Sequence, residues 1–220
     1  MNTLIPSNCN STNWINLRNK FLESLREAMT RNLVDEDIVD VLVLLNSIPC
    51  IVTSSSCSGR IALFAANAPG DKKRGGIVAK WHKPVTVDEL LQVLRRARLN
   101  NYRFVWVSAQ PLILALYTCS LPIANELLRV AERLGLKYSG MKIRENAIYI
   151  MILGTERVDI PLRVDNNVFI DLDNIKEISS IVDILNTYLV LAKRKLARLK
   201  RGLATSLTLV RKECEEATLH

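Results

Sequence analysis

The stretch Cys50–Ala66, CIVTSSSCSGRIALFAA, is where the sequence changes from helical to strand-forming patterns. Its apolar parts, Cys50–Thr53 and Arg60–Ala66, predict two strands, and the polar segment Ser54–Gly59 predicts the connection between them. Upstream, apolar residues at three- and four-residue intervals predict an amphipathic helix within the first 30 residues. A second helix is expected to begin at Asp35, whose carboxylate can cap free N–H groups.

Downstream, two helical segments resemble one another. DELLQVLRRARL, Asp88–Leu99, and NELLRVAERLGL, Asn125–Leu136, share six identical residues at an offset of 37. Strand-like runs precede or follow these helices: Ile77–Trp81, Arg103–Val107, Leu112–Tyr117, Met141–Arg144 and Ala147–Leu153. Turns at Ala109–Gln110 and Glu145–Asn146 predict tight hairpins. We therefore expect an α+β fold: a largely antiparallel sheet with an internal helix-strand-strand duplication, helices packed on one face, and long terminal helices.

The C-terminal part predicts one long helix, because apolar residues from Ile175 to Leu203 recur alternately every three and four residues. The N-terminal helix is its expected partner. We expect a single domain over residues 1–220, with N-terminal helices at 1–47, an α+β core at 48–172, the long helix at 173–203 and a tail at 204–220.

Composition narrows the class of protein. The formal net charge is +8 and the pI is near 9.4, which favours a polyanionic partner such as nucleic acid. Apolar runs are too short to span a membrane and no secretory signal is present, so we expect a soluble, cytoplasmic protein. The five cysteines are odd in number and lack a C-x-x-C spacing, so we expect reduced thiols, with neither disulfides nor a zinc site.

Two polar clusters carry candidate chemistry. In TSSSCSGR, Thr53–Arg60, hydroxyls and accessible N–H groups precede an arginine that suits a phosphate or carboxylate, although a serine-rich turn explains the pattern equally. In KWHKP, Lys80–Pro84, His82 can act as a base near neutral pH or serve a purely structural role. Further polar positions surround Gln110 and Ser139. No dinucleotide, ATPase, zinc-protease or serine-hydrolase motif is present in the sequence.

Four segments, in this order, resemble the tRNA wybutosine-synthesizing protein 3 family. They are TSSSCSGRI at Thr53–Ile61, KWHKP at Lys80–Pro84, QPLILALYTCSLPIANELLRVAERLGLKYSGMKI at Gln110–Ile143 and VDIPL at Val158–Leu162. The resemblance covers roughly residues 35–162. One departure is Gln110, since an acidic residue precedes the proline in some members of the family.

The resemblance implies a methyltransferase that uses S-adenosylmethionine and lacks the doubly wound sheet of most such enzymes. Its substrate would be N4 of the tricyclic guanine derivative on the 3′ side of the anticodon of tRNA-Phe. We expect the proton acceptor to be His82. The expected cofactor- or substrate-binding residues are Ser54, Ser55, Ser56, Cys57, Gly59, Arg60, Trp81, Gln110, Pro111, Ser139 and Gly140. Among these, Trp81 would serve as a stacking surface for the target base, unless it is a core residue.

The anticodon stem-loop of tRNA-Phe is the expected partner, with no metal and no membrane. Its expected contacts are Lys72, Lys73, Arg74, Lys193, Arg194, Arg198 and Arg201. A solvated helix face accounts for the last four equally well. Two other interpretations remain open at this point: a non-catalytic RNA-binding module, and a thiol-dependent enzyme that uses Cys57 and His82.

Overall fold

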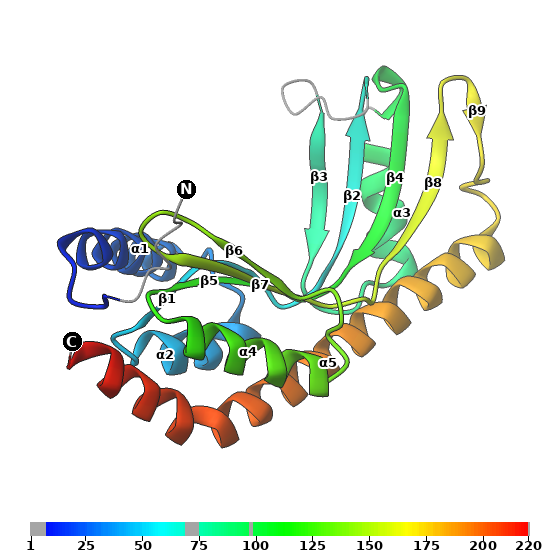
Figure 1. Cartoon of the computed structure of the whole chain (residues 1–220). Coiled ribbons are helices and arrows are strands. Elements are labelled where there is room, and N and C mark those ends of the chain that lie inside the picture. Colours follow the sequence, from blue (N-terminus) through cyan, green and yellow to red (C-terminus); the bar gives the residue numbers. More distant parts are fainter. Residues whose placement is uncertain (1–7, 69–74, 97–98, 220) are drawn as a thin grey trace. The chain divides into compact units, whose positions relative to one another are not determined.

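The computed structural model describes residues 8–68, 75–96 and 99–219, and divides the chain into two compact units. The first unit comprises Met1–Ser58, Leu112–Thr155 and Arg194–His220, and the second comprises Gly59–Pro111 and Glu156–Lys193. Each unit contains one antiparallel sheet (Figure 1). The α+β class and the antiparallel pairing predicted from the sequence are confirmed, but the strands belong to two sheets. Whether the chain behaves as the single domain expected from the sequence stays a prediction.

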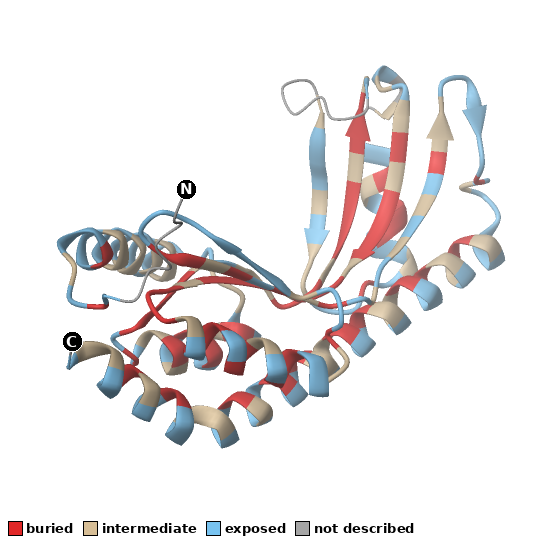
Figure 2. Cartoon of the chain, viewed as in Figure 1, coloured by how far each residue is buried: buried red, intermediate tan, exposed pale blue. Residues whose placement is uncertain are grey.

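The sheet of the first unit has the strand order β1-β5-β7-β6. Its strands are β1 (Ile51–Cys57), β5 (Ile113–Thr118), β6 (Gly140–Ile143) and β7 (Ile148–Leu153). Its helices are α1 (Thr12–Thr30), η1 (Glu36–Ile38), α2 (Val39–Asn46), α4 (Leu121–Arg133) and the C-terminal part of α5 (Ile175–Thr218). Leu114 and Leu116 are buried on the face that α2, α4 and α5 cover (Figures 1 and 2). Tyr117, which alternates with them along β5, lies on the other face and stacks on Phe21 of α1.

The sheet of the second unit has the order β3-β2-β4-β8-β9. Its strands are β2 (Arg60–Ala66), β3 (Gly76–Trp81), β4 (Phe104–Gln110), β8 (Val158–Val164) and β9 (Asn167–Val168), with α3 (Val87–Arg96), η2 (Leu99–Asn101) and the N-terminal part of α5. The core residues Ile61, Leu63 and Val107 pack under these helices. A capping box starts α3, since the Thr86 hydroxyl and the Glu89 carboxylate exchange hydrogen bonds with backbone N–H groups of one another. These bonds hold the pKa of Glu89 below its ordinary value.

The helix α5 is longer than predicted and has a different partner. The helix continues to Thr218, so residues 204–218, which we expected to form a tail, are helical. Buried Val210 and Cys214 extend its apolar seam into the core of the first unit. In that unit α5 packs against α4 rather than α1, because Gly202 lies against Val130 and Leu134. Small residues such as Gly202 permit this close approach of two helices.

Two of the predicted strand connections are wrong. β1 and β2 belong to different sheets, so the serine-rich segment is not a hairpin turn. β4 and β5 also belong to different sheets, so there is no hairpin at Ala109–Gln110. The hairpin at Glu145–Asn146 is confirmed by the pairing of Ile143 with Ile148. The predicted order of helix, strand and strand occurs twice, but only β6 and β7 pair with each other. The duplication therefore does not extend to strand pairing. The sequence could not show this, because periodicity does not indicate which strands share a sheet.

The expectation of reduced cysteines is wrong for four of the five. Two disulfides link Cys9 to Cys119 and Cys50 to Cys214, over sequence separations of 110 and 164 residues. Only tertiary structure brings such distant residues together, which is why spacing gave no sign of them. Cys57 is not part of a disulfide. Among the described helices, none has the length and apolarity that crossing a membrane requires.

Candidate functional site

The three consecutive serines lie in a strand rather than in a loop. β1 continues to Cys57 and carries a bulge between Thr53 and Ser55, where its register with β5 shifts. A bulge turns side chains away from strict alternation. Ser54, Ser55 and Ser56 line one wall of a cavity of about 230 Å³, to which α1, α2 and the segment between them also contribute. The serine hydroxyls are hydrogen-bond donors and acceptors in this wall.

Asp35 fixes the end of the serine strand. Its carboxylate accepts hydrogen bonds from the backbone N–H of Ser58 at 2.8 Å and from the Ser58 hydroxyl at 3.1 Å. The prediction that Asp35 caps a helix with its side chain is wrong, since it makes no such bond at the start of η1. The other end of β1 is fixed in a similar way, because the Thr53 backbone N–H donates to the side-chain oxygen of Asn46 at 3.0 Å. Side chains from before and within α2 thus hold the strand at both ends.

In the second unit, Gly59 and Arg60 begin β2 next to the end of β4. The Nε–H of Arg60 donates to the side-chain oxygen of Gln110 at 2.8 Å, and the two residues are direct cross-strand partners. This bond uses one of the five N–H donors of a guanidinium, so Arg60 is held in orientation for a carboxylate or phosphate. Gly59 has φ of +96°, and a Cβ there would lie 2.9 Å from the Cβ of Ala192 on α5. Glycine is therefore required at this position by both conformation and space.

A second polar group adjoins Arg60 and Gln110 on the same face of this sheet. Ser108 pairs with Asp159 across β4 and β8, and Arg157 donates to the Asp159 carboxylate at 2.7 Å. Partial burial is the largest influence on this carboxyl and disfavours its charge. The hydrogen bonds from Arg157 and Ser108, together with the charge of Arg157, outweigh it, so the pKa of Asp159 lies below its ordinary value. The same hydrogen bond raises the pKa of Arg157. Asp159 is therefore a stable anion at neutral pH.

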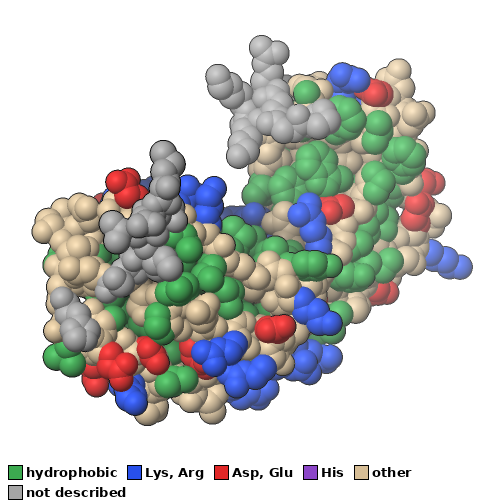
Figure 3. Space-filling model, in the orientation of Figure 1, with side chains coloured by type: hydrophobic (Ala, Val, Ile, Leu, Met, Phe, Trp, Pro, Cys, Tyr) green, Lys and Arg blue, Asp and Glu red, His purple; other side chains and the backbone are tan. Residues whose placement is uncertain are grey.

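A row of apolar side chains, two of them aromatic, crosses the same face two residues along the strands from Ser108 and Asp159. The register aligns Ile77, Phe64, Trp106 and Pro161, and the rings of Phe64 and Trp106 stack with centroids 5.1 Å apart and planes 6° from parallel. Core packing uses the opposite face, which α3 and α5 cover (Figure 1). Hydrophobic side chains accordingly gather over these strands at the surface in Figure 3. Ile77 is 44% exposed, and Phe64 and Trp106 are half-buried.

The remaining predicted site residues have different surroundings. Trp81 ends β3 opposite Ile61 and packs against the core of the second unit, so a core role explains it. His82 follows directly and is half-buried. Pro111 is buried. In the first unit the Ser139 hydroxyl accepts a hydrogen bond from the Leu153 backbone N–H at 3.1 Å, at the start of β6.

The structure brings some of these residues together and separates others. Arg60 and Gln110 are in contact. Gly140 and Ser55 share one row of the first sheet, through Met151 and Ala115, but three strand spacings or roughly 14 Å separate them. The pair Ser139 and Gly140 therefore lies at the opposite edge of that sheet from the serines. Cys57 pairs with Ile113 at the end of β1 and is half-buried.

The predicted basic ridge on α5 is smaller than expected. Arg194, Arg198 and Arg201 are exposed and follow one another at helical spacing. Two neighbouring lysines are engaged elsewhere in the first unit: Lys195 donates to the Thr155 hydroxyl at 2.8 Å, and Lys200 forms an ion pair with Asp40. Lys193 is half-buried. Lys72, Lys73 and Arg74 lie outside the described residues. Lys and Arg side chains gather over α4 and α5 in Figure 3.

Sequence reasoning missed three features of this arrangement. The role of Asp35 toward Ser58 depends on a contact between residues 23 positions apart. Asp159 lies inside the VDIPL segment, where a single acid in an apolar strand was the available signal. The aromatic row had a signal too, since Phe64 and Trp106 both occur on the solvent-facing positions of alternating strands.

Comparison with known proteins identifies the family. The family described as "Methyltransferase TYW3" matches residues 16–205. A protein of Thermococcus sibiricus named tRNA(Phe) 7-((3-amino-3-carboxypropyl)-4-demethylwyosine(37)-N(4))-methyltransferase is 34% identical over 184 residues, which cover 83% of this chain and 90% of that protein. A protein of Archaeoglobus fulgidus with the same name is 32% identical over 190 residues, or 86% of this chain and 93% of that protein.

Solved structures with a similar fold are also known. The PH1069 protein from Pyrococcus horikoshii OT3 matches with a TM-score of 0.75 and 28% identity, over 94% of this chain and 99% of that one. A hypothetical protein from Aeropyrum pernix matches with a TM-score of 0.63 and 26% identity, over 81% and 98%. These findings select the methyltransferase interpretation over a non-catalytic RNA-binding module and a thiol-dependent enzyme. The chain belongs to the methyltransferase TYW3 family, and the resemblance inferred from the sequence is confirmed.

Proposed function

We propose that this chain transfers a methyl group from S-adenosylmethionine to N4 of the wyosine-type base at position 37 of tRNA(Phe). The supporting observation is the extent of the family match, since residues 16–205 contain every described candidate site residue from the serine strand to α5. Relatives named for this reaction align with more than four fifths of the chain. A tRNA substrate also agrees with the net charge of +8 and with the cytoplasmic location expected from the sequence.

The donor groups of the site suit S-adenosylmethionine. Its amino-acid part offers a carboxylate, for which the guanidinium of Arg60 in the second unit is a matched partner. The serines of the first unit offer hydroxyls that suit a polyhydroxyl group. The cavity beside Ser54–Ser56, at about 230 Å³, is below the usual range for a whole ligand of this size, so it would hold only a part of one. Bound S-adenosylmethionine supplies a methyl group on a sulfonium centre that is ready for displacement.

The protein's own tasks are alignment and removal of a proton. Gln110 orients Arg60, and Asp35 fixes Ser58, so the groups at both ends of the Ser58–Gly59 connection are preorganised within their own units. The accepting nitrogen of the base must lose a proton during transfer. His82 is the proposed acceptor of that proton, because its ordinary pKa is near neutral and it lies in the KWHKP segment next to Trp81.

The proposed surface for the anticodon loop is the part of the second sheet that carries Phe64 and Trp106, on the face opposite its hydrophobic core. Stacked Phe64 and Trp106 offer an aromatic surface for unpaired bases, and Arg60 lies on the same face four residues earlier in β2. Base stacking on such a side chain contributes about 1–3 kcal/mol per base, judged by alanine substitution. Arg194, Arg198 and Arg201 are proposed to contact backbone phosphates of the anticodon stem, as an exposed basic helix face does.

Replacement of Arg60 tests the proposed function. Arg60→Ala should weaken S-adenosylmethionine binding, measured by titration calorimetry, about 10- to 150-fold, because a charge-assisted hydrogen bond contributes about 1.5–3 kcal/mol. Transfer of a labelled methyl group to tRNA(Phe) carrying the unmethylated base should fall at least as much. Arg95→Ala is the matched control, since Arg95 is an exposed arginine of the same unit that pairs with Asp173. An Arg60→Ala protein with normal binding and transfer would remove this arginine from the site.

Replacement of Trp106 tests the RNA surface separately. Trp106→Ala should weaken tRNA binding about 5- to 150-fold and leave S-adenosylmethionine binding unchanged. If wild-type protein transferred no methyl group to this tRNA while binding S-adenosylmethionine, the proposed substrate would be wrong.

A further inference from the structure

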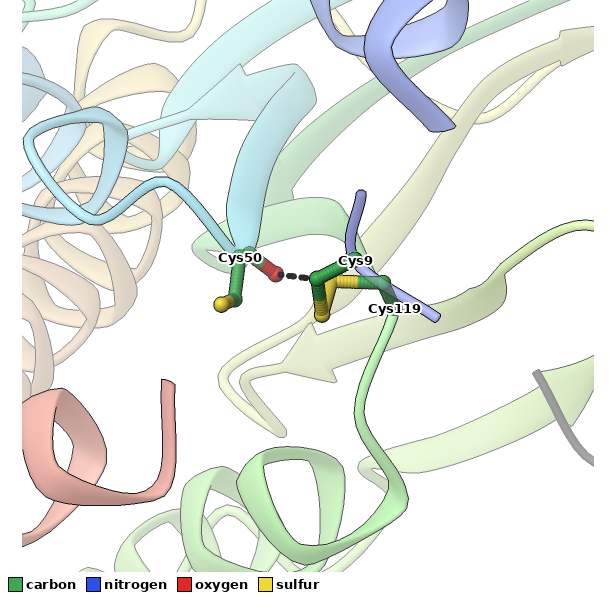
Figure 4. Close-up of side chains that lie close together, drawn as sticks. All are labelled: Cys9, Cys50 and Cys119. Atoms are coloured by element: carbon green, nitrogen blue, oxygen red, sulfur yellow. Dashed lines mark hydrogen bonds between the residues drawn. A yellow bond between two sulfur atoms is a disulfide. The ribbon is translucent and has the colours of Figure 1, made fainter. Parts of the chain in front are cut away.

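Four cysteines from distant parts of the sequence meet at one point of the first unit. Cys9 precedes α1, Cys50 directly precedes β1, Cys119 lies between β5 and α4, and Cys214 belongs to the last turns of α5. All four are buried, with exposures of 5%, 0%, 1% and 4%. Figure 4 shows the bridge between Cys9 and Cys119 beside Cys50. The two disulfides therefore lie together as one cysteine cluster in the core of the first unit, with the sulfur atoms of Cys9, Cys50 and Cys119 near one another and that of Cys214 bonded to Cys50.

The spacing within this cluster suits a metal ion. The sulfur atoms of Cys9, Cys50 and Cys119 all lie within 4.8 Å of one another, and Cys214 is bonded to Cys50. A tetrahedral Zn²⁺ site with four thiolates has Zn–S distances of about 2.3 Å, which places its sulfur atoms roughly 3.8 Å apart. Reduction releases the sulfur of Cys214 from Cys50, and this sulfur must then turn toward the other three to complete the site. Two disulfides have no intrinsic reason to be in contact, whereas the four ligands of one metal ion must be.

The local electrostatics favour thiolates at two of the positions. Cys119 directly precedes Ser120, the N-cap of α4, and Cys9 lies two residues before Ser11, the N-cap of α1. Helix N-termini carry partial positive charge and stabilise nearby thiolates. The side chains around the cluster are apolar and buried, and the sulfur atoms of Cys50 and Cys119 contact the backbone carbonyls of Cys214 and Cys50. Sulfur ligands in a dry site select soft or borderline cations such as Zn²⁺.

We propose that Cys9, Cys50, Cys119 and Cys214 are a zinc-binding site in the reduced protein, and that the two disulfides are its oxidised form. Two equivalents of a dithiol reductant open the two bridges, each dithiol becoming a disulfide and each bridge becoming two thiols. Zn²⁺ then replaces the four thiol protons, which pass to solvent, and no further electrons move. In both forms the cluster ties the same four segments together. It thereby anchors β1, the strand that carries Ser54–Ser56, independently of the redox state and of the proposed function.

Cobalt binding to the reduced protein is the direct test. The chain is reduced with a phosphine, freed of reductant without oxygen, checked by thiol titration, and titrated with Co²⁺. We expect one Co²⁺ per chain, with the visible bands of a tetrahedral site, a sulfur-to-cobalt charge-transfer band, and displacement by Zn²⁺. Cys119→Ser should lose one thiolate from this spectrum. Cys57→Ser is the matched control and should keep the full spectrum, because Cys57 belongs to neither disulfide.

The thermal stability of the wild-type protein supplies a second test, which needs no cysteine variant. Zn²⁺ should raise the midpoint of thermal unfolding of the reduced wild type and should leave that of the oxidised wild type unchanged. The proposal is overturned if the reduced wild type takes up no Co²⁺, or if Cys57→Ser abolishes the charge-transfer band. Bridges that resist reduction in the native protein would overturn it equally, since no thiolates would then be formed.

Discussion

Gly59→Ala tests the reasoning about the junction between the serine strand and β2. Two costs add. Gly59 has φ of +96°, and a residue with a Cβ in such a conformation costs about 1–3 kcal/mol. The new Cβ would also lie 2.9 Å from the Cβ of Ala192 and 3.4 Å from the Gln110 carbonyl oxygen, and overpacking of this kind costs about 1–3 kcal/mol. We expect the free energy of unfolding to fall by about 2–6 kcal/mol.

Denaturant unfolding measures this change, and heating should show it as a drop of roughly 4–24 °C in the midpoint for a chain of this size. Gly140→Ala is the control for glycine replacement in general, because no atom lies within 4 Å of its added Cβ and its φ is not in the left-handed region. Its stability should stay within about 0.5 kcal/mol of wild type.

A double-mutant cycle separates the two costs. Ala192→Gly removes the atom in closest conflict, and by itself costs about 1 kcal/mol as a glycine within a helix. In the presence of Gly59→Ala it should recover the overpacking part, giving a favourable coupling of about 1–3 kcal/mol, and leave the conformational part. A Gly59→Ala protein as stable as Gly140→Ala would refute the argument. Absence of coupling would show that α5 does not restrict this position.

Three further predictions concern the proposed chemistry and its charges. His82→Asn should lower the rate of methyl transfer about 10²–10⁴-fold with S-adenosylmethionine affinity nearly unchanged, with partial recovery at high pH; weakened binding with normal turnover would make His82 a binding residue. Replacement of Arg194, Arg198 and Arg201 on α5 by glutamine should weaken tRNA binding and flatten the dependence of its affinity on salt concentration. An unchanged salt dependence would place the RNA elsewhere. The pKa of Asp159 is lowered in the folded state, so its stabilising effect is complete above its unfolded pKa and is lost as pH falls through the folded value. Asp159→Asn should therefore cost stability at pH 7, by at most about 1 kcal/mol for so exposed a pair, and cost nothing near pH 2; an equal loss at both pH values would contradict this.

The family and the local structure of this protein were determined by its sequence. Periodic apolar residues predicted α1, α3, α4 and α5, because a helix in water must bury one stripe of its surface. The segment from Thr53 to Arg60 and the KWHKP segment pointed to the family, because they match its motifs in residue type and in order. Arg60 and Gln110 were both predicted, although only the register of β2 with β4 shows that they touch.

Tertiary structure alone decided how the strands are divided and which distant residues meet. A strand pattern repeats every two residues whichever sheet the strand joins, so the sequence placed β1 with β2 and β4 with β5 although each pair is divided between two sheets. Contacts over long separations leave no local pattern either, and for this reason Asp35 was expected to cap a helix rather than bind Ser58. The cysteine cluster is the extreme case. Cys50 and Cys214 are 164 residues apart, and their meeting depends on α5 continuing to Thr218, because the packing of a whole helix rather than any spacing of cysteines brings the sulfur atoms together.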